Sequence, residues 1–340
     1  MSIAPSTNPN LAFVRDDHPQ AAPTGAGRRG FDDLRGRTVL VTGARGFLGR
    51  HLVRRLMAEG AEVHATTRAP EAGGFPTANP TWHRCEVTDA TEVAELVDHV
   101  RPGVVCHLAS RVEGRRDHAL ALPMLDANTR AAVAIMEAAQ RLQGCRVVLA
   151  GSVEEPRAGA APCSPYAAAK AATTAYAQLY AAQWLLPVTV LRIAMVYGPD
   201  QPDETKLVPY SIRCFLEGTS PELASGARLI DWVYIDDVVD AFVRAATSPN
   251  AGGLIADIGS GHAHSILEVV TRLAELTGYQ GPLRFGDRAD RPDDVAHLAN
   301  PRPARSALDW RSHTDLNAGL ARTVQWHRQR RVPASRVATG

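Results

Sequence analysis

A tyrosine and a lysine lie four residues apart in the segment Tyr166-Ala-Ala-Ala-Lys170. The alanines favour a helix, and this spacing places both side chains on the same helix face. An ammonium group beside a phenol stabilises the phenolate, so Tyr166 can exchange a proton with a carbonyl or an alcohol. The chain has only two lysines, Lys170 and Lys206, so a chance pairing is rare. We predict an acid/base pair; the alternative is a core tyrosine beside a solvated lysine.

Three glycines, Gly43, Gly46 and Gly49, form the pattern G-x-x-G-x-x-G. They follow a β-branched segment, residues 38–43, that predicts a buried strand, and they open a segment with helical spacing, residues 47–58. Glycines let the backbone approach a pyrophosphate, whose charge meets the free N–H groups at the start of the helix. The pattern predicts a dinucleotide-binding loop; the alternative is a tight strand–helix turn without a ligand.

The second predicted strand, residues 61–67, bears on the choice of dinucleotide. A site for NAD places a carboxylate at the end of this strand to bind the ribose 2′-hydroxyl, whereas a site for NADP places a cation there. Here the strand ends in Thr66-Thr67-Arg68, and Arg45 lies inside the glycine loop. Two guanidinium groups favour the 2′-phosphate of NADP(H). NAD(H) is the alternative, with both arginines as solvated surface residues.

A serine and a glutamate stand at the end of another predicted strand, residues 145–152. Ser152 lies fourteen residues before Tyr166, and we expect it at the same carboxyl edge of the sheet, where its hydroxyl can hold a substrate oxygen. Glu154 follows two residues later. Taken alone, Ser152 is equally compatible with a turn, and Glu154 with a solvated loop carboxylate.

Short β-branched segments alternate with Ala- and Leu-rich segments between residues 38 and 193, which predicts an α/β fold with a doubly wound parallel sheet. The predicted strands are residues 38–43, 61–67, a short segment ending at 85, 104–110, 145–152 and 187–193. The predicted helices between them are residues 47–58, 91–100, 128–142 and 165–182.

The domain organisation follows from a change of pattern after residue 193, where Gly, Pro and charged residues interrupt the alternation. We predict a dinucleotide-binding Rossmann domain over residues 36–193, joined by about residues 234–260, and a smaller mixed substrate-binding lobe. The lobe comprises residues 194–233 and 261–330, with flexible tails at 1–35 and 331–340. The later helices are expected at 236–246, 266–276 and 316–327, and loops at 197–230 and 282–304.

Composition excludes several classes of protein. The 37 Lys and Arg residues nearly balance 36 Asp and Glu residues, so neither nucleic acid nor an anionic membrane is an expected partner. Five cysteines without a C-x-x-C pair indicate a reduced, cytoplasmic chain. No apolar segment approaches the length of a membrane span, and no secretory signal pattern is present. The histidines lack metal-ligand spacing, so no metal site is predicted.

From about residue 36 to residue 328, the chain resembles the extended short-chain dehydrogenase/reductase superfamily, in particular its nucleotide-sugar epimerases, dehydratases and reductases. The segments that carry the resemblance are TGARGFLG (42–49), HLAS (107–110), Asn128, GS (151–152), YAAAK (166–170), LRIAMVYGP (191–199), DWVYIDDVVDA (231–241) and IGSG (258–261). The resemblance implies that Ser152, Tyr166 and Lys170 form a catalytic triad, with Lys170 also binding the nicotinamide ribose.

The same resemblance implies a set of cofactor-binding residues. Glu86 stands where the family usually has Asp and is expected to face the adenine, and residues 108–110 are expected to line the cofactor channel. The full set is Gly43, Arg45, Gly46, Phe47, Leu48, Gly49, Arg68, Glu86, Val87, Leu108, Ala109, Ser110, Asn128, Tyr166, Lys170 and Ile193. Relatives often dimerise through two long helices, here near 128–142 and 165–182, so a homodimer is expected.

Residues after Ser152 bear on the reaction. Nucleotide-sugar 4,6-dehydratases resemble Thr-Asp-Glu at this place, and Val153 cannot donate the proton that their Asp supplies. The segment Gly-Ser-Val-Glu-Glu is most similar to reductases of GDP-linked 4-keto-6-deoxy sugars. The expected function is therefore NADPH-dependent reduction of a nucleotide-linked 4-keto sugar, with Tyr166 as the acid and Glu154 in the site. The alternatives are a 4-epimerase or 4,6-dehydratase that recycles its cofactor, and an NADP-sensing protein without catalysis.

Two positions depart from the family pattern for the nucleotide-sugar substrate. Met195 stands where Asn is usual, and Ile230 stands where an Arg commonly binds the substrate diphosphate. Either a cation elsewhere supplies the charge, or the substrate binds differently or is not a nucleotide sugar. The expected substrate contacts are Val153, Met195, Lys206, Arg228 and Arg291, with Arg213 as a further candidate cation.

Overall fold

The computed structural model describes residues 33–68, 80–157, 159–287 and 296–331. Residues 1–32 of the expected N-terminal tail lie outside these ranges, and so do Arg291 and residues 332–340.

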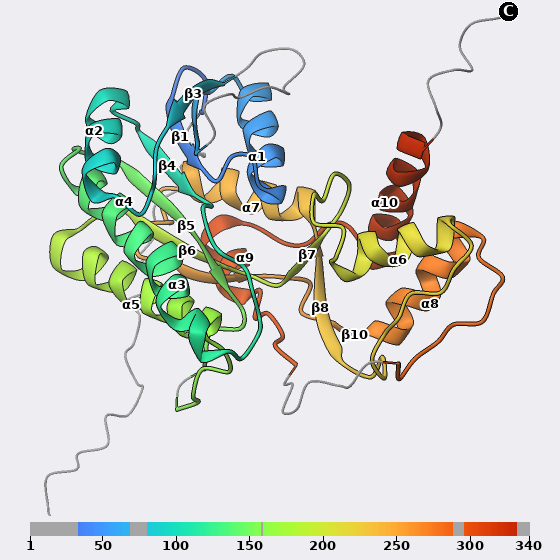
Figure 1. The fold of residues 1–340 in the computed structure, drawn as a ribbon. Helices are drawn as coiled ribbons and strands as arrows, with labels where there is room; N and C mark the ends of the chain where they lie inside the picture. The colour runs from blue at the N-terminus through green and yellow to red at the C-terminus, as the bar shows by residue number, and fades with distance from the viewer. Residues whose placement is uncertain (1–32, 69–79, 158, 288–295, 332–340) are drawn as a thin grey trace, which may run out of the picture. The chain divides into compact units, whose positions relative to one another are not determined.

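A seven-stranded parallel sheet forms the larger layer of the described chain (Figure 1), with the strand order β3-β2-β1-β4-β5-β6-β9. The predicted doubly wound α/β fold is thus confirmed. The order reverses between β1 and β4, and ligands of open α/β sheets bind at such a switch point. The strands are β1 Thr38–Thr42, β2 Glu62–Thr67, β3 Thr81–Arg84, β4 Val104–His107, β5 Arg146–Ser152, β6 Val188–Ile193 and β9 Ile255–Ile258.

Helices cover both faces of this sheet, and each face buries its own apolar cluster. Along β1, Val41 packs toward α1, α7 and α9, whereas its neighbour Leu40 packs toward α2, α4 and α5. Because both faces are covered, the central strands are apolar along their length rather than alternating. The helices are α1 Phe47–Ala58, α2 Ala90–Val100, α4 Ala131–Gln140, α5 Pro165–Trp184, α7 Ile235–Thr247 and α9 Arg302–Leu308.

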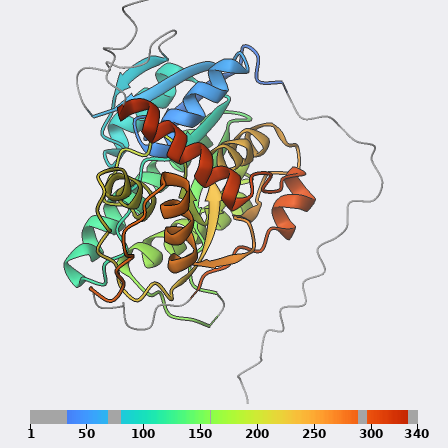
Figure 2. The same cartoon turned by 90° about the vertical axis from the view of Figure 1, so that its right-hand side faces the viewer.

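A second, three-stranded sheet has the order β10-β8-β7 and packs with three helices around a third apolar cluster. Figure 2 faces this layer, with α10 in red lying against α8. β7 follows β6 after one residue, so the chain passes directly from the larger sheet into the smaller one. The elements are β7 Met195–Tyr197, α6 Leu207–Leu216, β8 Leu229–Tyr234, β10 Ala263–Ser265, α8 Ile266–Thr277 and α10 Leu316–Arg331.

Several predicted elements differ from the observed ones. The helix expected at 128–142 is instead a composite: a 3-10 turn His118–Leu120, α3 Ala121–Met124, a π-helical turn Leu125–Arg130 (η2), and then α4. Helices α6 and α9 lie where loops were expected. Their prolines, Pro209 and Pro303, were interpreted as interruptions, but a proline in the first turn of a helix removes no intrahelical hydrogen bond. The strand expected at 104–110 ends at His107.

The buried carboxylate of Asp231 joins segments that are far apart in the sequence. At the start of β8, it accepts hydrogen bonds from the backbone and hydroxyl of Ser260 (2.8 and 2.7 Å), from Gly261 N (2.9 Å) and from Ala299 N (3.1 Å). Four donors satisfy this carboxylate at 1% exposure. The connection leaving β9 and the chain before α9 are therefore fixed to the smaller sheet.

Candidate functional site

The glycine loop connects β1 to α1 at the carboxyl edge of the sheet. Gly43 has a φ of +67°, and a Cβ there would lie 2.6 Å from Ala109 N. A Cβ on Gly49 would lie 2.2 Å from Gly43 O, so the loop and helix pack at a distance that only glycine allows. Gly46 caps α1 without a side-chain hydrogen bond. The first N–H groups of α1, at Phe47 and Leu48, are therefore not capped by a side chain at position 46 and are donors of the kind that can bind an anion.

The loop after β4 is held against the glycine loop by Thr42. Its hydroxyl oxygen accepts hydrogen bonds from Leu108 N and Ala109 N, both at 3.2 Å. With both lone pairs engaged, the hydroxyl proton is directed to His107 Nδ1, 2.8 Å away, which places the histidine proton on Nε2. Burial, with a smaller contribution from the Lys170 charge, lowers the pKa of His107 to about 3. His107 is therefore neutral at physiological pH.

Asn128 holds the next part of the same loop from the opposite side. Its Oδ1 accepts hydrogen bonds from Ser110 Oγ (2.7 Å) and Arg111 N (3.0 Å), and its Nδ2 donates to Arg111 O (3.1 Å). Asn128 lies in the π-helical turn η2, and its own carbonyl accepts a hydrogen bond from Thr173 on α5 (3.2 Å). The structure thus brings Ser110 and Asn128 together, as two residues of the expected cofactor set.

Ser152, Tyr166 and Lys170 form one cluster between β5 and α5. Helix α5 begins at Pro165 because Ser164 caps it, accepting a hydrogen bond from Ala167 N (3.1 Å). The Ser152 side chain lies close enough to the Tyr166 hydroxyl to lower its pKa. The Lys170 ammonium donates to the carbonyl of Ala150 at 2.7 Å and lies 5.8 Å from the centre of the Tyr166 ring. Tyr166 and Lys170 share one helix face, as their spacing predicts.

Burial sets the resting charges of this cluster. It raises the pKa of Tyr166, as does the charge of Glu154 nearby, while the Ser152 side chain opposes them. Burial also lowers the pKa of Lys170 to about 8, partly offset by the charge of Glu155. At neutral pH Tyr166 is a protonated phenol beside a mostly charged ammonium. Such a pair can donate a proton to an oxygen that becomes an alkoxide.

An aromatic ring supports one arginine near the end of β2. The guanidinium of Arg45 lies over the ring of Trp82 on β3, 5.5 Å from its centre. Arg68 is exposed immediately after β2, and in the strand register Arg84 lies opposite Thr67. Trp82 is a member of this site that sequence reasoning missed, because a tryptophan on a short strand has no pattern that distinguishes it from a core residue.

Four further residues of the expected site lie after β3, after β5 and at the end of β6. Glu86 accepts two hydrogen bonds from Thr88 through Oε1 (3.2 Å from the backbone, 2.9 Å from the hydroxyl), and Val87 packs in the α2 and α4 cluster. Val153 is buried and donates to the carbonyl of Ile193 (3.2 Å), which is half-buried.

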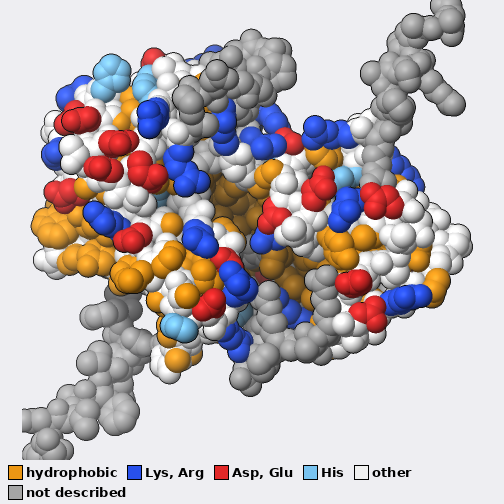
Figure 3. Space-filling model, in the orientation of Figure 1, with side chains coloured by type: hydrophobic (Ala, Val, Ile, Leu, Met, Phe, Trp, Pro, Cys, Tyr) orange, Lys and Arg blue, Asp and Glu red, His pale blue; other side chains and the backbone are white. Residues whose placement is uncertain are grey.

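Two of the expected substrate cations, Lys206 and Arg228, lie in the smaller layer, and Arg291 lies outside the described residues. Lys206 precedes α6 and is ion-paired with Asp203 (3.5 Å), and half-buried Arg228 precedes β8. Met195 on β7 is 37% exposed. Figure 3 shows a hollow with hydrophobic side chains in its floor between the α3 and α5 side of the molecule and α6. A ligand bound there would contact both layers.

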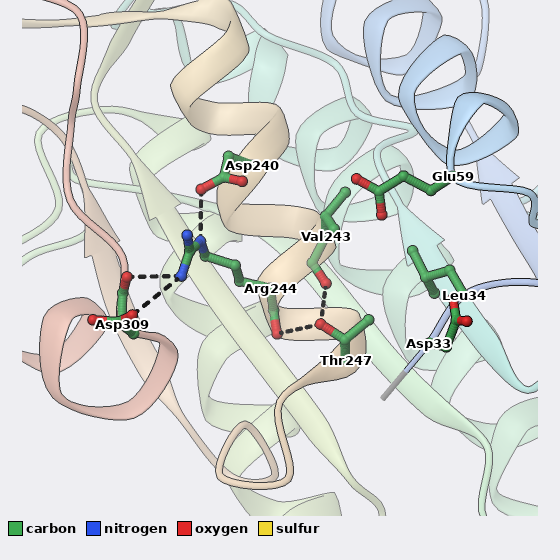
Figure 4. Close-up of a pocket in the computed structure, with 8 residues that line it drawn as sticks. All are labelled: Asp33, Leu34, Glu59, Asp240, Val243, Arg244, Thr247 and Asp309. Carbon is green, nitrogen blue, oxygen red and sulfur yellow. Dashed lines mark hydrogen bonds and ion pairs between the residues drawn. The ribbon is translucent and has the colours of Figure 1, made fainter. Parts of the chain in front are cut away.

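A different depression, of about 360 Å³, lies at the other end of α1 (Figure 4). Glu59, which lines it, follows a helix of 12 residues that begins at the glycine loop, a length of about 18 Å. Its charged groups are paired: Arg244 donates to Asp240 (2.7 Å) and to the carbonyl of Asp309 (2.8 Å). These interactions are structural, so this depression is not the candidate site.

Within residues 33–68, 80–157, 159–287 and 296–331, no three His, Cys, Asp or Glu side chains are arranged to hold a metal ion. Nor is any helix in those ranges both long and apolar enough to cross a membrane.

The chain is similar in sequence to enzymes of nucleotide-sugar metabolism. A profile of the NAD dependent epimerase/dehydratase family matches residues 39–259. A UDP-glucose 4-epimerase of Mycolicibacterium smegmatis is 33% identical, over 86% of this chain and 98% of that protein. A dTDP-glucose 4,6-dehydratase of the same organism is 29% identical, over 85% and 93% of the two chains.

The fold is also similar to solved structures of proteins in complex with NAD and uridine nucleotides. MoeE5 in complex with UDP-glucuronic acid and NAD is 32% identical with a TM-score of 0.76, covering 86% of this chain and 99% of that chain. WbmF of Bordetella bronchiseptica, in complex with NAD+ and UDP, is 26% identical with a TM-score of 0.73, covering 87% and 93%. The similarity extends through both sheets rather than the dinucleotide-binding part alone.

Proposed function

This chain belongs to the NAD dependent epimerase/dehydratase family and is an oxidoreductase-type enzyme of the extended short-chain dehydrogenase/reductase kind. On this basis, we propose that it transfers a hydride between a nicotinamide dinucleotide and C4 of a nucleotide-linked sugar. The observation that carries the proposal is the cluster of Ser152, Tyr166 and Lys170 at the carboxyl edge of the sheet. The cluster combines a buried phenol close to Ser152 with a buried ammonium on the same helix face.

The site has features that fit a dinucleotide. Gly43 and Gly49 leave the backbone of the loop accessible, and the uncapped start of α1 offers N–H groups to a pyrophosphate. When bound, the nicotinamide supplies or accepts the hydride. Ser152 and Tyr166 would hold the sugar oxygen at C4, Tyr166 would donate or accept its proton, and Lys170 would stabilise the phenolate and bind the nicotinamide ribose.

Reduction of a 4-keto sugar is the direction that this chain's own residues favour. Val153 is buried and apolar at the position where an acid would be needed for the elimination of water. Glu154 is half-buried close enough to influence Tyr166, and its carboxylate is suited to binding sugar hydroxyls. For these reasons we propose an NADPH-dependent 4-ketoreductase, with Tyr166 protonating the new alkoxide.

A 4-epimerase is the second candidate, and the relatives favour it. Both the 33%-identical relative and the related Thermus thermophilus structure are UDP-glucose 4-epimerases, the latter in complex with NAD. An epimerase keeps one dinucleotide bound and reoxidises it within each turnover. The sensor alternative is disfavoured, because a protein that only binds the dinucleotide does not need Tyr166 as a proton donor.

The proposed preference for NADP(H) depends on the cations near β2. Arg45 is held over Trp82, Arg68 is exposed at the end of the strand, and neither β2 nor residue 68 presents a carboxylate where a 2′-hydroxyl would bind. Arg84, opposite Thr67, adds a third guanidinium to the same sheet edge.

Replacing Tyr166 by Phe tests the catalytic proposal. The variant should lose turnover by a factor of roughly 100 or more, because the proton donor is gone, while dinucleotide binding measured by fluorescence titration should stay the same. Ser152→Ala provides a second, smaller loss. A Tyr166→Phe enzyme that retains the wild-type rate would refute the assignment of Tyr166.

The nucleotide released when the purified protein is denatured distinguishes the two candidate reactions. Near-stoichiometric NAD(P), identified by mass, would indicate a recycled cofactor, and so a 4-epimerase or a 4,6-dehydratase. Little retained nucleotide, with NADPH consumed stoichiometrically by a 4-keto nucleotide sugar, would indicate the reductase.

We further propose that the enzyme is a cytoplasmic homodimer that takes a nucleotide-sugar substrate. The five cysteines are free thiols, as a reducing compartment would keep them. Exposed apolar side chains gather on α5 and on the segment that precedes α4, with Leu122 at 71% and Leu179 at 40% exposure. Figure 3 shows this hydrophobic surface over α5.

A further inference from the structure

Glu155 lies beneath the cluster of Ser152, Tyr166 and Lys170 and is 3% exposed. Its Oε1 accepts a hydrogen bond from Ser152 N at 2.8 Å, and its Oε2 accepts one from the hydroxyl of Thr174 at 2.7 Å. Thr174 lies on α5, one turn after Lys170. A single carboxylate therefore connects the end of β5 to the helix that carries both the phenol and the ammonium group.

The backbone leaves room for this carboxylate. At Gly151, directly before Ser152, a Cβ would lie 2.7 Å from Glu155 Oε1 and 2.8 Å from a Val190 methyl group. Because glycine occupies the position, the carboxylate can approach the strand closely enough to reach Ser152 N.

The positive charges near Glu155 are only partly balanced by other carboxylates. Two cations act on it: Lys170 from α5 and Arg192 from β6. Arg192 already donates to the buried carboxylate of Asp257 at 2.7 Å, so much of its charge is balanced there. His107, which faces Lys170 from β4, is uncharged because burial lowers its pKa to about 3.

Ionisation of Glu155 and of Lys170 is therefore coupled. Burial raises the pKa of Glu155, while hydrogen bonds from Ser152 and Thr174 and the charges of Arg192 and Lys170 lower it. Burial lowers the pKa of Lys170 to about 8, and Glu155 counteracts this effect. Glu154 and Glu155 both raise the pKa of Tyr166.

We propose that Glu155 is a positioning residue of this site, which fixes Ser152 to helix α5 and supplies the negative charge that keeps Lys170 in its ammonium form. The proposal rests on the proposed function of the cluster, because it assigns Glu155 a purpose only if Ser152 and Lys170 act on a substrate. A purely structural residue would need the two hydrogen bonds but not the charge. Glu155→Gln separates these roles, since glutamine keeps the shape without the charge: its oxygen can accept from Ser152 N, and its amide nitrogen can donate to the Thr174 hydroxyl oxygen.

The chain offers a direct readout of the charge, because Lys170 is one of only two lysines. With 13Cε-labelled lysine, the protein should give two lysine signals by NMR, and Lys206→Arg assigns the remaining signal to Lys170. The pH titration of that signal in the absence of any ligand should have a lower midpoint in Glu155→Gln than in the wild type. An unchanged or higher midpoint would overturn the proposal.

Glu154→Gln is the matched control, since it removes a neighbouring charge that acts on Tyr166 and is not among the charges that shift Lys170. It should leave the Lys170 midpoint unchanged; a shift equal to that of Glu155→Gln would overturn the specific role of Glu155. Should Glu155→Gln fail to fold, Thr174→Ala removes one hydrogen bond and keeps the charge. Its Lys170 midpoint should match the wild type, and a lowered midpoint would overturn the charge role.

Turnover provides the functional part of the test. At pH 7, Glu155→Gln should lower kcat by roughly tenfold with little change in NADPH affinity, because the reacting groups, not the dinucleotide site, are altered. Wild-type kcat in Glu155→Gln would overturn the positioning role. A wild-type protein that turns over no nucleotide sugar would count against the proposed function instead, and the Lys170 titration would still test Glu155 separately.

Discussion

Lys170 is buried, and its charge depends on a small number of neighbours. Burial lowers its pKa from the usual 10.5 to about 8, so the ammonium form prevails below pH 8 and is lost above it. Because the charged form stabilises the phenolate of Tyr166, we expect kcat/KM to be level from about pH 6.5 to 7.5 and to fall as the pH rises through 8. Initial-rate assays across this range would measure the fall of kcat/KM with pH. Circular dichroism at each pH would exclude unfolding as its cause.

Lys170→Arg is the control for this pH dependence, because a guanidinium stays protonated throughout the range. The variant should be slower, since its geometry differs, but its alkaline limb near pH 8 should disappear. An unchanged limb in Lys170→Arg would assign the titration to another group.

Arg68 is the second residue whose role is testable by one substitution. A charge-assisted hydrogen bond to a phosphate is worth about 1.5–3 kcal/mol, so Arg68→Ala should weaken NADPH binding by roughly 10- to 100-fold. NADH binding should change little, because NADH has no 2′-phosphate. Isothermal titration with both nucleotides measures the ratio.

The exposed Arg305 of α9 provides a matched arginine, and Arg305→Ala should bind both nucleotides as the wild type does. Equal losses of NADPH and NADH affinity in Arg68→Ala would contradict the proposed preference for NADP(H).

For single residues, the sequence predicted site members whose chemistry requires a fixed spacing along the chain. It did not predict residues whose role depends only on contacts made in the folded protein. The spacing of Tyr166 and Lys170 and the strand end at Ser152 predicted a cluster that the fold brings together. Glu155 has no such signature, because its importance lies in a hydrogen bond to Ser152 N and in burial, which only the folded backbone creates. The ring of Trp82 under Arg45 is the same kind of residue.

Among the elements, the turn from β1 into α1 is the most constrained sterically. Gly49→Ala would place a Cβ 2.2 Å from Gly43 O, so the loop must shift. We expect a loss of about 1–3 kcal/mol in the free energy of unfolding and a loss of dinucleotide binding. Urea denaturation and fluorescence titration would measure the two effects.

Gly103→Ala is the corresponding control before β4, where the nearest atom to an added Cβ is Thr38 O at 3.9 Å. Its stability should stay within about 0.5 kcal/mol of the wild type. If both variants behaved alike, close packing would not explain the glycine at position 49.

Elements with strong periodicity were predicted nearly to the residue, and those that depend on tertiary contacts were not. Helix α1 begins and ends where its apolar spacing indicated, at Phe47 and Ala58. The π-helical turn at Asn128 could not be predicted, because it exists to bring one side chain to Ser110 and one carbonyl to Thr173. The helix propensity of the residues around Asn128 does not depend on Ser110 or Thr173, so it could not indicate either contact.

For the whole molecule, the expected assembly rests on the apolar surface of α5 and the segment before α4. Leu122, Leu125, Tyr176 and Leu179 are 40–71% exposed, which is costly for a monomer. We expect a dimer of about twice the chain mass in light scattering after gel filtration, and a monomer for Leu179→Arg. Leu267→Arg alters a leucine of similar exposure on α8, 46%, and should remain dimeric. A monomeric wild type, or monomers in both variants, would refute this interface.

The buried carboxylate of Asp231 has a consequence for the relative motion of the two sheets. By accepting hydrogen bonds from Ser260, Gly261 and Ala299 at once, it connects β8 of the smaller sheet to the segment that follows β9 and to the segment that precedes α9. A rotation of one layer against the other would have to break these hydrogen bonds and leave a buried carboxylate without donors, which makes such a motion costly.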